Sequence, residues 1–201
     1  TQVLGLPTAY TGIAIGIALA VDSITDPVIG SLSDNWQGTI GRRHPFIFAS
    51  ILPLGLVFIG LFNPPDLGEF ALFLWLTVFS VSTRALMTLY YVPHISLGAE
   101  LSEDFNERTE VVAYRYFFSY FGGILTYIIG FVVYFPDTQF DTAAYGPFGR
   151  TLSLIMMASV LFTAFGTRSR IPYLTVSQSN QDKISPLSVL KKTVAEIRSA
   201  L

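Results

Sequence analysis

Five apolar segments, each long enough to cross a lipid bilayer as a helix, constrain the fold of this 201-residue chain more than any other feature. At a rise of about 1.5 Å per residue, roughly 20 apolar residues span the 30 Å or so of bilayer hydrocarbon. The five segments cover about residues 8–32, 45–62, 70–97, 111–135 and 149–166. Because unpaired backbone groups are too costly in lipid, this pattern predicts an all-α integral membrane bundle.

The composition agrees with a membrane environment. Hydrophobic residues make up 51% of the chain and charged residues only 13%, whereas soluble domains carry about 25% charged residues. There is no cysteine, which excludes disulfides and thiolate metal sites. The net charge is −2, and no basic run of the kind that binds nucleic acid is present. The lipid bilayer is therefore the expected surrounding, and nucleic acid is not an expected partner.

Lysine and arginine are distributed asymmetrically between the two sets of connections. The connections 32–44 and 98–110, together with the tail after Gly166, contain all of these residues except Arg84, Arg115 and Arg150. The connections 63–69 and 136–148 contain none, and Arg150 lies at the edge of the second. The positive-inside rule then predicts that the first set is cytoplasmic and that the N-terminus of this segment lies outside. A multi-pass protein of the cell (inner or plasma) membrane is expected.

The chain divides at about residue 170 into a bundle (1–170) and a polar tail (171–201). Ser185 and Pro186 supply a helix start, and apolar residues at helical spacing predict an amphipathic helix over 186–201. This tail is expected to be a cytoplasmic loop, and either a linker role or a regulatory role fits it. The first residues show no Met start and no leader, so we expect a segment of a larger protein.

Two carboxylates, Asp22 and Asp26, lie four residues apart in the first apolar segment. Such residues share a helix face, with Cβ atoms roughly 6 Å apart, and each ionised carboxylate in a bilayer costs about 2.5–3.5 kcal/mol. Pro27 frees a carbonyl one turn earlier, and Thr25 adds a hydroxyl. The set predicts a site for a small hard cation or a shared proton. The alternative is that Asp26 only caps or neighbours the following loop.

Two arginines and a tyrosine are the other unusual residues within apolar segments. Arg84 lies near the middle of the third segment, and its role stays open. Arg115 is about one turn into the fourth, where it either faces the bundle interior or extends to the headgroups. Tyr91 lies near Thr88 and His94 on the third segment, where an aromatic face with hydroxyls suits a sugar and equally suits packing or an interfacial aromatic belt.

Enzyme chemistry has little support in the sequence. With no Cys and only two His, no nucleophile and base stand out, and no Gly-rich phosphate loop is present. Asp34, Gly41, Arg42 and Arg43 instead form a charged loop after the first segment, where salt bridges between helix ends are expected. No enzyme and no cofactor other than a coupling ion are predicted.

Taken together, these motifs resemble the glycoside–pentoside–hexuronide:cation symporters, the melibiose-permease-like branch of the major facilitator superfamily. The resemblance covers nearly all of residues 1–170. It rests on the following residues: Asp22-x-x-Thr25-Asp26-Pro27, Gly30-x-Leu32-Ser33-Asp34, Gly41-Arg42-Arg43-His44-Pro45-Phe46, Tyr91 to Leu101, Glu107-Arg108-Thr109 and Ala113-Tyr114-Arg115.

The resemblance implies a twelve-helix transporter, of which this chain supplies helices two to six and the central loop. The first helix and the C-terminal six-helix half would then be further parts of the same protein. It assigns Asp22, Asp26, Thr25 and Thr88 to a cation site, which would hold Na⁺ on Asp22 and Asp26 if sodium is the coupling ion. It assigns Arg115 to the sugar, and Tyr91 occupies a sugar-site position although it departs from the family's residue there.

Three functions follow in order of preference. The first is a secondary active transporter that couples a sugar or sugar acid to Na⁺ or H⁺ by alternating access. The second is a major facilitator carrier of another solute class, such as an organic anion or a drug, with Arg84 and Arg115 facing the anion. The third is a membrane scaffold or sensor that does not transport, with the tail as its docking element. Neither the sugar nor the coupling ion can be read from the residues.

Overall fold

Five long helices form the fold. The computed structural model describes residues 5–36, 40–102 and 104–173, and within these residues every regular element is helical. In chain order they are α1 (Thr8–Asn35), α2 (His44–Phe62), α3 (Glu69–Glu100), α4 (Phe105–Ile128), the π-helix η1 (Ile129–Tyr134), α5 (Thr142–Gly166) and the 3₁₀-helix η2 (Arg168–Tyr173). Five helical stretches, with η1 extending α4, are long and apolar enough to cross a membrane, so the predicted all-α membrane fold is confirmed.

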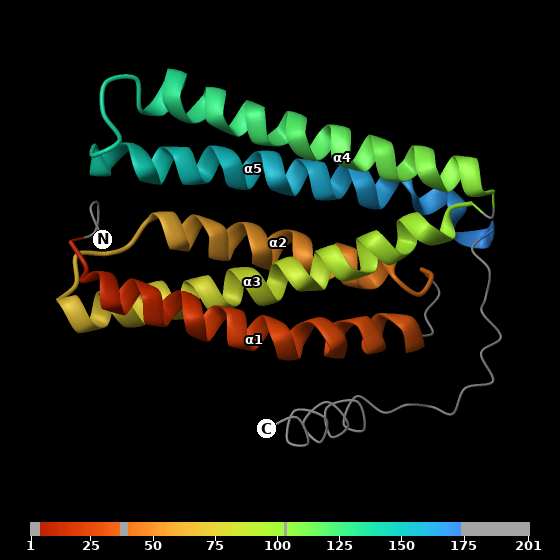
Figure 1. Ribbon diagram of the computed structural model, residues 1–201, viewed down its shortest axis with the longest axis horizontal. Helices are drawn as coiled ribbons and strands as arrows, with labels where there is room; N and C mark the ends of the chain where they lie inside the picture. The colour runs from red at the N-terminus through yellow and green to blue at the C-terminus, as the bar shows by residue number, and fades with distance from the viewer. Residues whose placement is uncertain (1–4, 37–39, 103, 174–201) are drawn as a thin grey trace.

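Successive helices run in opposite directions along the long axis of the bundle (Figure 1). As a result α1 and α3 are parallel neighbours, α2 packs against both α3 and α5, and α4 contacts α3 at the outer side of the bundle (Figure 1). The connection from α1 to α2, the connection from α3 to α4 and the end of α5 all lie at one end of the bundle (Figure 1). That end, here termed the arginine end, carries Arg42, Arg43, Arg108 and Arg168.

Two helices begin earlier than the apolar segments suggest. α4 starts at Phe105 rather than at 111, because the Asp104 carboxylate accepts hydrogen bonds from the backbone N–H groups of Asn106 and Glu107. α5 starts at Thr142 rather than at 149, and Asp141 accepts from the Ala143 N–H. Both aspartates are N-caps, which satisfy otherwise unpaired donors of the first turn. A polar capped turn therefore extends each helix beyond its apolar part.

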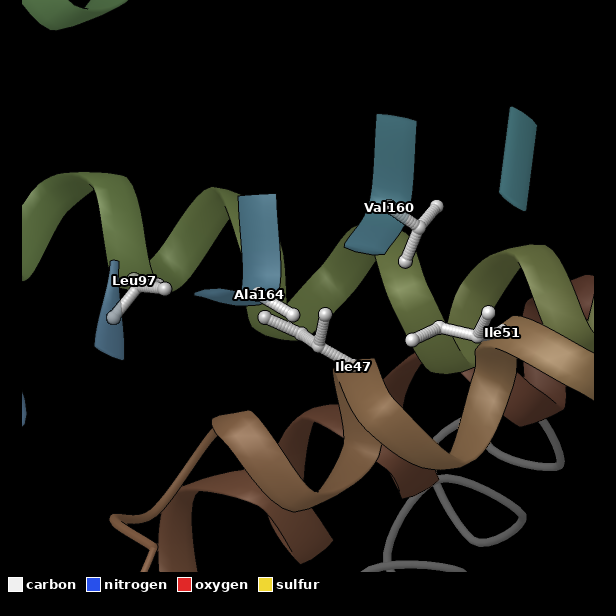
Figure 2. Close-up of a cluster of buried hydrophobic side chains, with 5 residues drawn as sticks. All are labelled: Ile47, Ile51, Leu97, Val160 and Ala164. Atoms are coloured by element: carbon white, nitrogen blue, oxygen red, sulfur yellow. The ribbon is translucent and has the colours of Figure 1, made fainter. Parts of the chain in front are cut away.

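A buried apolar cluster holds α2, α3 and α5 together. Figure 2 shows its five members: Ile47 and Ile51 of α2, Leu97 of α3, and Val160 and Ala164 of α5. Nearby, the hydroxyl of Ser153 on α5 donates to the carbonyl of Gly55 on α2 at 2.8 Å. Because lipid is as apolar as these side chains, van der Waals packing and such hydrogen bonds are what favour helix association in a bilayer.

In the first half of α1, the buried small residues are alanines rather than glycines. Ala14 and Ala18 are 0% and 1% exposed, whereas a Cβ added at Gly12 or Gly16 would meet nothing within 4 Å. A Gly-x-x-x-Gly pattern usually marks a surface where another helix packs closely. No helix of the described residues packs against Gly12 and Gly16 in this way. The alanines lie two residues later and so on another face of α1.

α4 is the least embedded helix of the bundle. None of its residues is buried, and its π-helical extension η1 makes the main contact with α5. There the Tyr134 hydroxyl and the Thr151 hydroxyl are 2.5 Å apart. α3, in contrast, contacts α1, α2 and α4, and it contains the buried Pro93.

The charged loop predicted after α1 forms an ion-pair cluster at the arginine end. Arg43 is 7% exposed. It pairs with Asp34 at 2.8 Å and donates to Glu100 Oε1 from Nη2 at 2.6 Å and from Nε at 2.9 Å. Arg42 donates to the same Glu100 oxygen at 2.6 Å. Gly41, with φ at 82°, makes the turn before the two arginines, a backbone conformation that glycine adopts without steric cost.

Glu100 is the member of this cluster that the sequence did not reveal, because it lies at the far end of α3. The predicted tail helix over 186–201 lies outside the described residues, as does the tail from residue 174 onward. The division of the chain near residue 170 stays a prediction.

Replacing Gly149 by alanine should destabilise the bundle. A Cβ at Gly149 would overlap the Cβ of Phe62, an atom next to the backbone that cannot turn away. Overpacking of this kind costs about 1–3 kcal/mol, so the detergent-solubilised full-length protein should unfold at a lower temperature. Gly16→Ala is the matched control, since both changes add one methyl group within a helix and only Gly149 has a neighbour in the way. Equal melting temperatures for both variants would contradict this packing.

Replacing Glu100 by glutamine should destabilise the arginine end more than replacing Asp34 by asparagine. The Glu100 side chain is 21% exposed and binds two arginines, whereas the Asp34 side chain is 55% exposed and binds one. Hydrogen bonds to charged groups contribute about 1.5–3 kcal/mol, and an exposed ion pair contributes about 0–1 kcal/mol. Thermal unfolding of both variants measures the difference, and a larger effect of Asp34→Asn would be the contrary result.

Candidate functional site

Two polar pairs join α1 to α3 within the apolar bundle, and we call them the α1–α3 polar seam. Asp22 pairs with Arg84, and Asp26 with Thr88. Both pairs have the same sequence separation of 62 residues, as expected for two parallel helices packed in one register. Since the residues of each helix are four apart, they lie on one face of their helix. The seam therefore consists of two successive rungs, one helical turn apart.

The first rung is an ion pair. Nη1 of Arg84 donates to Oδ2 of Asp22 at 2.5 Å, with the two side chains 43% and 21% exposed. The other carboxylate oxygen, Oδ1 of Asp22, is buried and finds no hydrogen-bond partner among residues 5–36, 40–102 and 104–173. An intramembrane arginine usually pairs with a carboxylate, and here the structure supplies a partner that the sequence left open.

The second rung is a hydrogen bond between a hydroxyl group and a carboxyl group. The Thr88 hydroxyl, which is 7% exposed as a residue, donates to Oδ1 of Asp26 at 2.7 Å. Asp26 itself is exposed. Because α1 continues to Asn35, Asp26 lies inside the helix and does not cap it. The alternative of a loop-capping Asp26 is wrong for this reason.

The structure brings three of the four expected cation-site residues to the seam. Asp22, Asp26 and Thr88 lie on it, but the Thr25 hydroxyl donates to the backbone carbonyl of Asp22 at 3.3 Å. No group of three or more His, Cys, Asp or Glu side chains suited to a metal ion occurs in the described part of the chain. A bound metal ion would thus depend on hydroxyl, carbonyl or water oxygens in addition to the two carboxylates.

The two expected substrate residues do not join the seam. Tyr91 is 52% exposed on α3, and Arg115 lies half-buried on α4 with its guanidinium carbon 5.5 Å from the Tyr116 ring centre. Within the described residues, no hydrogen bond or ion pair links Tyr91 or Arg115 to each other or to the seam. His94, expected near them, stacks on Tyr90 with ring centres 5.1 Å apart.

One sequence signal could have revealed the role of Arg84. Asp22 and Asp26 are four residues apart, and so are Arg84 and Thr88. When two helices run parallel, two residues four apart on one helix can both face two residues four apart on the other. The order of the residues then pairs Asp22 with Arg84 and Asp26 with Thr88. Alternating helix directions already make the first and third segments parallel, so the equal spacing could be noted without coordinates, whereas the register that pairs Asp22 with Arg84 comes from the structure.

The seam is suited to moving a positive charge on and off a carboxylate. With both aspartates ionised and Arg84 protonated, its net charge is −1. One further cation or proton makes it neutral, which lowers the cost of placing the group in a membrane. At the arginine end, by contrast, the Asp34 and Glu100 carboxylates are both bound to arginines.

Comparisons with known proteins place the chain among membrane transporters. The family model described as "MFS/sugar transport protein" matches residues 1–198. The chain is 26% identical over 193 residues to an "uncharacterized symporter" of Synechocystis, covering 93% of this chain and 36% of that protein. It is 24% identical over 196 residues to the isoprimeverose transporter of Lactiplantibacillus pentosus, covering 96% of this chain and 40% of that protein.

A third relative is a putative glycoside/cation symporter of Escherichia coli, 25% identical over 124 residues, with 62% of this chain and 27% of that protein covered. The chain thus spans well under half the length of these curated relatives. The family and its relatives are transporters rather than enzymes, and the expected resemblance to the melibiose-permease-like branch is confirmed. With a family model matched along almost its whole length, this multi-pass membrane chain belongs to the MFS/sugar transport protein family.

Proposed function

We propose that the protein is a secondary active transporter that couples the movement of a sugar or glycoside to that of a cation, Na⁺ or H⁺. The observation that supports this most directly is the α1–α3 polar seam, in which Asp26 accepts from the buried Thr88 hydroxyl at 2.7 Å. Ionisable residues inside a membrane are costly and mark ion pathways. A scaffold would gain nothing from two such carboxylates on one face.

The relatives support the same proposal. Two of them are named as a putative glycoside/cation symporter and an isoprimeverose transporter, so sugar as the substrate class and a cation as the coupling ion are the natural extension to this protein. Transport would occur by alternating access, with one helical half rocking against another around a midplane site. The arginine end would be cytoplasmic by the positive-inside rule.

A carrier of organic anions is less well supported. That alternative needs a free cationic side chain facing the substrate, and Arg84 is instead bound to Asp22 at 2.5 Å. Of the two arginines that this alternative would use, only Arg115 on α4 has no ion-pair partner in the described residues.

Replacing Asp26 by asparagine should abolish coupled accumulation. In proteoliposomes of the full-length protein, the internal-to-external sugar ratio under a cation gradient should fall to about 1, the value for passive equilibration across the membrane. Radiolabelled isoprimeverose and a panel of common disaccharides serve as probes. Asp66→Asn, in the exposed α2–α3 connection, is the control and should accumulate sugar like the wild type. If sugar still accumulates in both the Asp22→Asn variant and the Asp26→Asn variant, these two residues do not take part in coupling.

Replacing Thr88 by valine should weaken coupling without abolishing it. The change removes one hydrogen bond to Asp26 and keeps the shape of the side chain. A hydrogen bond to a charged group contributes about 1.5–3 kcal/mol, so the cation concentration for half-maximal uptake should shift by roughly ten- to a hundredfold. An unchanged half-maximal concentration would show that Thr88 acts only in packing.

Replacing Arg115 by alanine should weaken sugar binding and leave the fold intact. Loss of charged hydrogen bonds to sugar hydroxyls should raise the dissociation constant by about ten- to a hundredfold, measured by equilibrium binding to the purified full-length protein. Arg150→Ala, an exposed arginine on α5, is the matched control. Competition by organic acids but not by sugars would instead favour the carrier of anions.

A further inference from the structure

His44 is a buried titratable side chain that the proposed function does not use. It is the first residue of α2 and is 0% exposed, although it lies at the arginine end directly after Arg42 and Arg43. We propose that His44 is a pH-sensitive latch, which ties the start of α2 to the end of α5 when it is neutral and releases that end when it is protonated. This inference goes beyond the proposed function, and its test does not depend on transport.

The latch consists of a hydrogen bond between two helices. Nε2 of His44 and the hydroxyl oxygen of Thr167, the C-cap residue of α5, are 3.0 Å apart. The Thr167 hydroxyl donates its one hydrogen to the backbone carbonyl of Thr163 at 2.7 Å. It can therefore only accept from His44. Nε2 thus carries a hydrogen, and in the neutral ring Nδ1 does not.

The second ring nitrogen has no comparable partner. Nδ1 of His44 is buried and makes no hydrogen bond to any of the residues 5–36, 40–102 and 104–173. Because the side chain is fully enclosed, a further part of the protein could reach Nδ1 only if these helices moved apart. A proton taken up from water and bonded to Nδ1 would be an unpaired buried donor and a buried charge, each of which costs free energy.

The charges around the imidazole also oppose its protonation. Arg42 and Arg43 precede it in the chain, and the first N–H groups of α2 carry a partial positive charge. The nearby carboxylates of α1 and α3, Asp34 and Glu100, are already bound to these two arginines. On the α5 side, the residue after the C-cap is the exposed Arg168. Three positive and two negative side chains do not compensate a further positive charge.

Release of the latch would be confined to the end of α5. Three residues before Thr167, Ala164 packs with Ile47 of α2 in the buried apolar cluster, and this contact does not depend on charge. Beyond it, η2 lies against the α1–α2 connection, since a Cβ added at Gly41 would be 3.1 Å from Cγ2 of Ile171. Protonation of the ring therefore frees the last turn of α5 and η2, while the bundle stays intact.

The test is amide hydrogen exchange of residues 163–173, measured by mass spectrometry on the purified full-length protein at pH 7.5 and 5.5. The reporter is the Thr167 amide, which donates to the Thr163 carbonyl at 3.1 Å. An opening that takes up one proton is favoured up to tenfold per pH unit below the ordinary histidine pKa of about 6.5. Protection, corrected for the intrinsic pH dependence of exchange, should therefore fall about tenfold between the two pH values.

Two pairs of variants isolate the latch. His44→Gln can still donate to Thr167 but cannot be charged, so its protection should not change with pH. His94→Gln removes the other histidine of this segment and should keep the tenfold change. Thr167→Val leaves the buried N–H unpaired, so at pH 7.5 its protection should be about tenfold or more below that of the wild type. Thr167→Ser retains the hydroxyl and should resemble the wild type.

Equal wild-type protection at both pH values would overturn the inference, and this result does not depend on whether any variant folds. A His44→Gln protein that keeps the pH dependence would overturn it too, as would a Thr167→Val protein with wild-type protection at pH 7.5. The proposed coupled transport is tested separately, by sugar accumulation in the aspartate variants, so failure of one proposal leaves the other standing.

Discussion

The parallel register of α1 and α3 is the constraint on which the rest of the site depends. Parallel packing follows from the alternation of helix directions, and the shared separation of 62 residues places Asp22 beside Arg84 and Asp26 beside Thr88. In a bilayer, where apolar contacts alone give no preference between neighbours, such polar pairs and small-residue contacts decide which helices associate. The buried Ala14 and Ala18 allow the two helices to approach closely enough for both pairs to form.

The fold was readable from the sequence because its determinants are local and repeated. Long apolar segments predict helices wherever lipid excludes other structures, and the all-α bundle followed. The starts of α4 and α5 could not be read from apolar length alone, since Asp104 and Asp141 cap polar first turns that a hydropathy pattern assigns to loops. The π-helix at the end of α4 likewise has no signature in apolar periodicity.

The candidate site was only partly readable, for a different reason. Asp22 and Asp26 stand out because carboxylates are rare in apolar segments, but their partners are set by helix register, a long-range property. Arg84 and Glu100 were therefore missed as partners, although each binds a residue that the sequence had singled out. Thr25 was assigned to the cation site because its hydroxyl is an oxygen ligand close to the aspartates. In the structure this hydroxyl donates to a backbone carbonyl of its own helix, as threonine hydroxyls in helices often do.

Pro93 separates the two parts of α3 that make polar contacts with other segments, with Arg84 and Thr88 before it and Glu100 after it. A proline has no N–H to donate to the carbonyl four residues earlier, which is that of Leu89, one residue after Thr88. α3 should therefore bend most easily near Pro93. This position lies between its polar contacts with α1 and the ion pairs of Glu100 with Arg42 and Arg43. Because Pro93 lies between the two sets of contacts, a bend there would tilt the segment with Arg84 and Thr88 without breaking the Glu100 ion pairs.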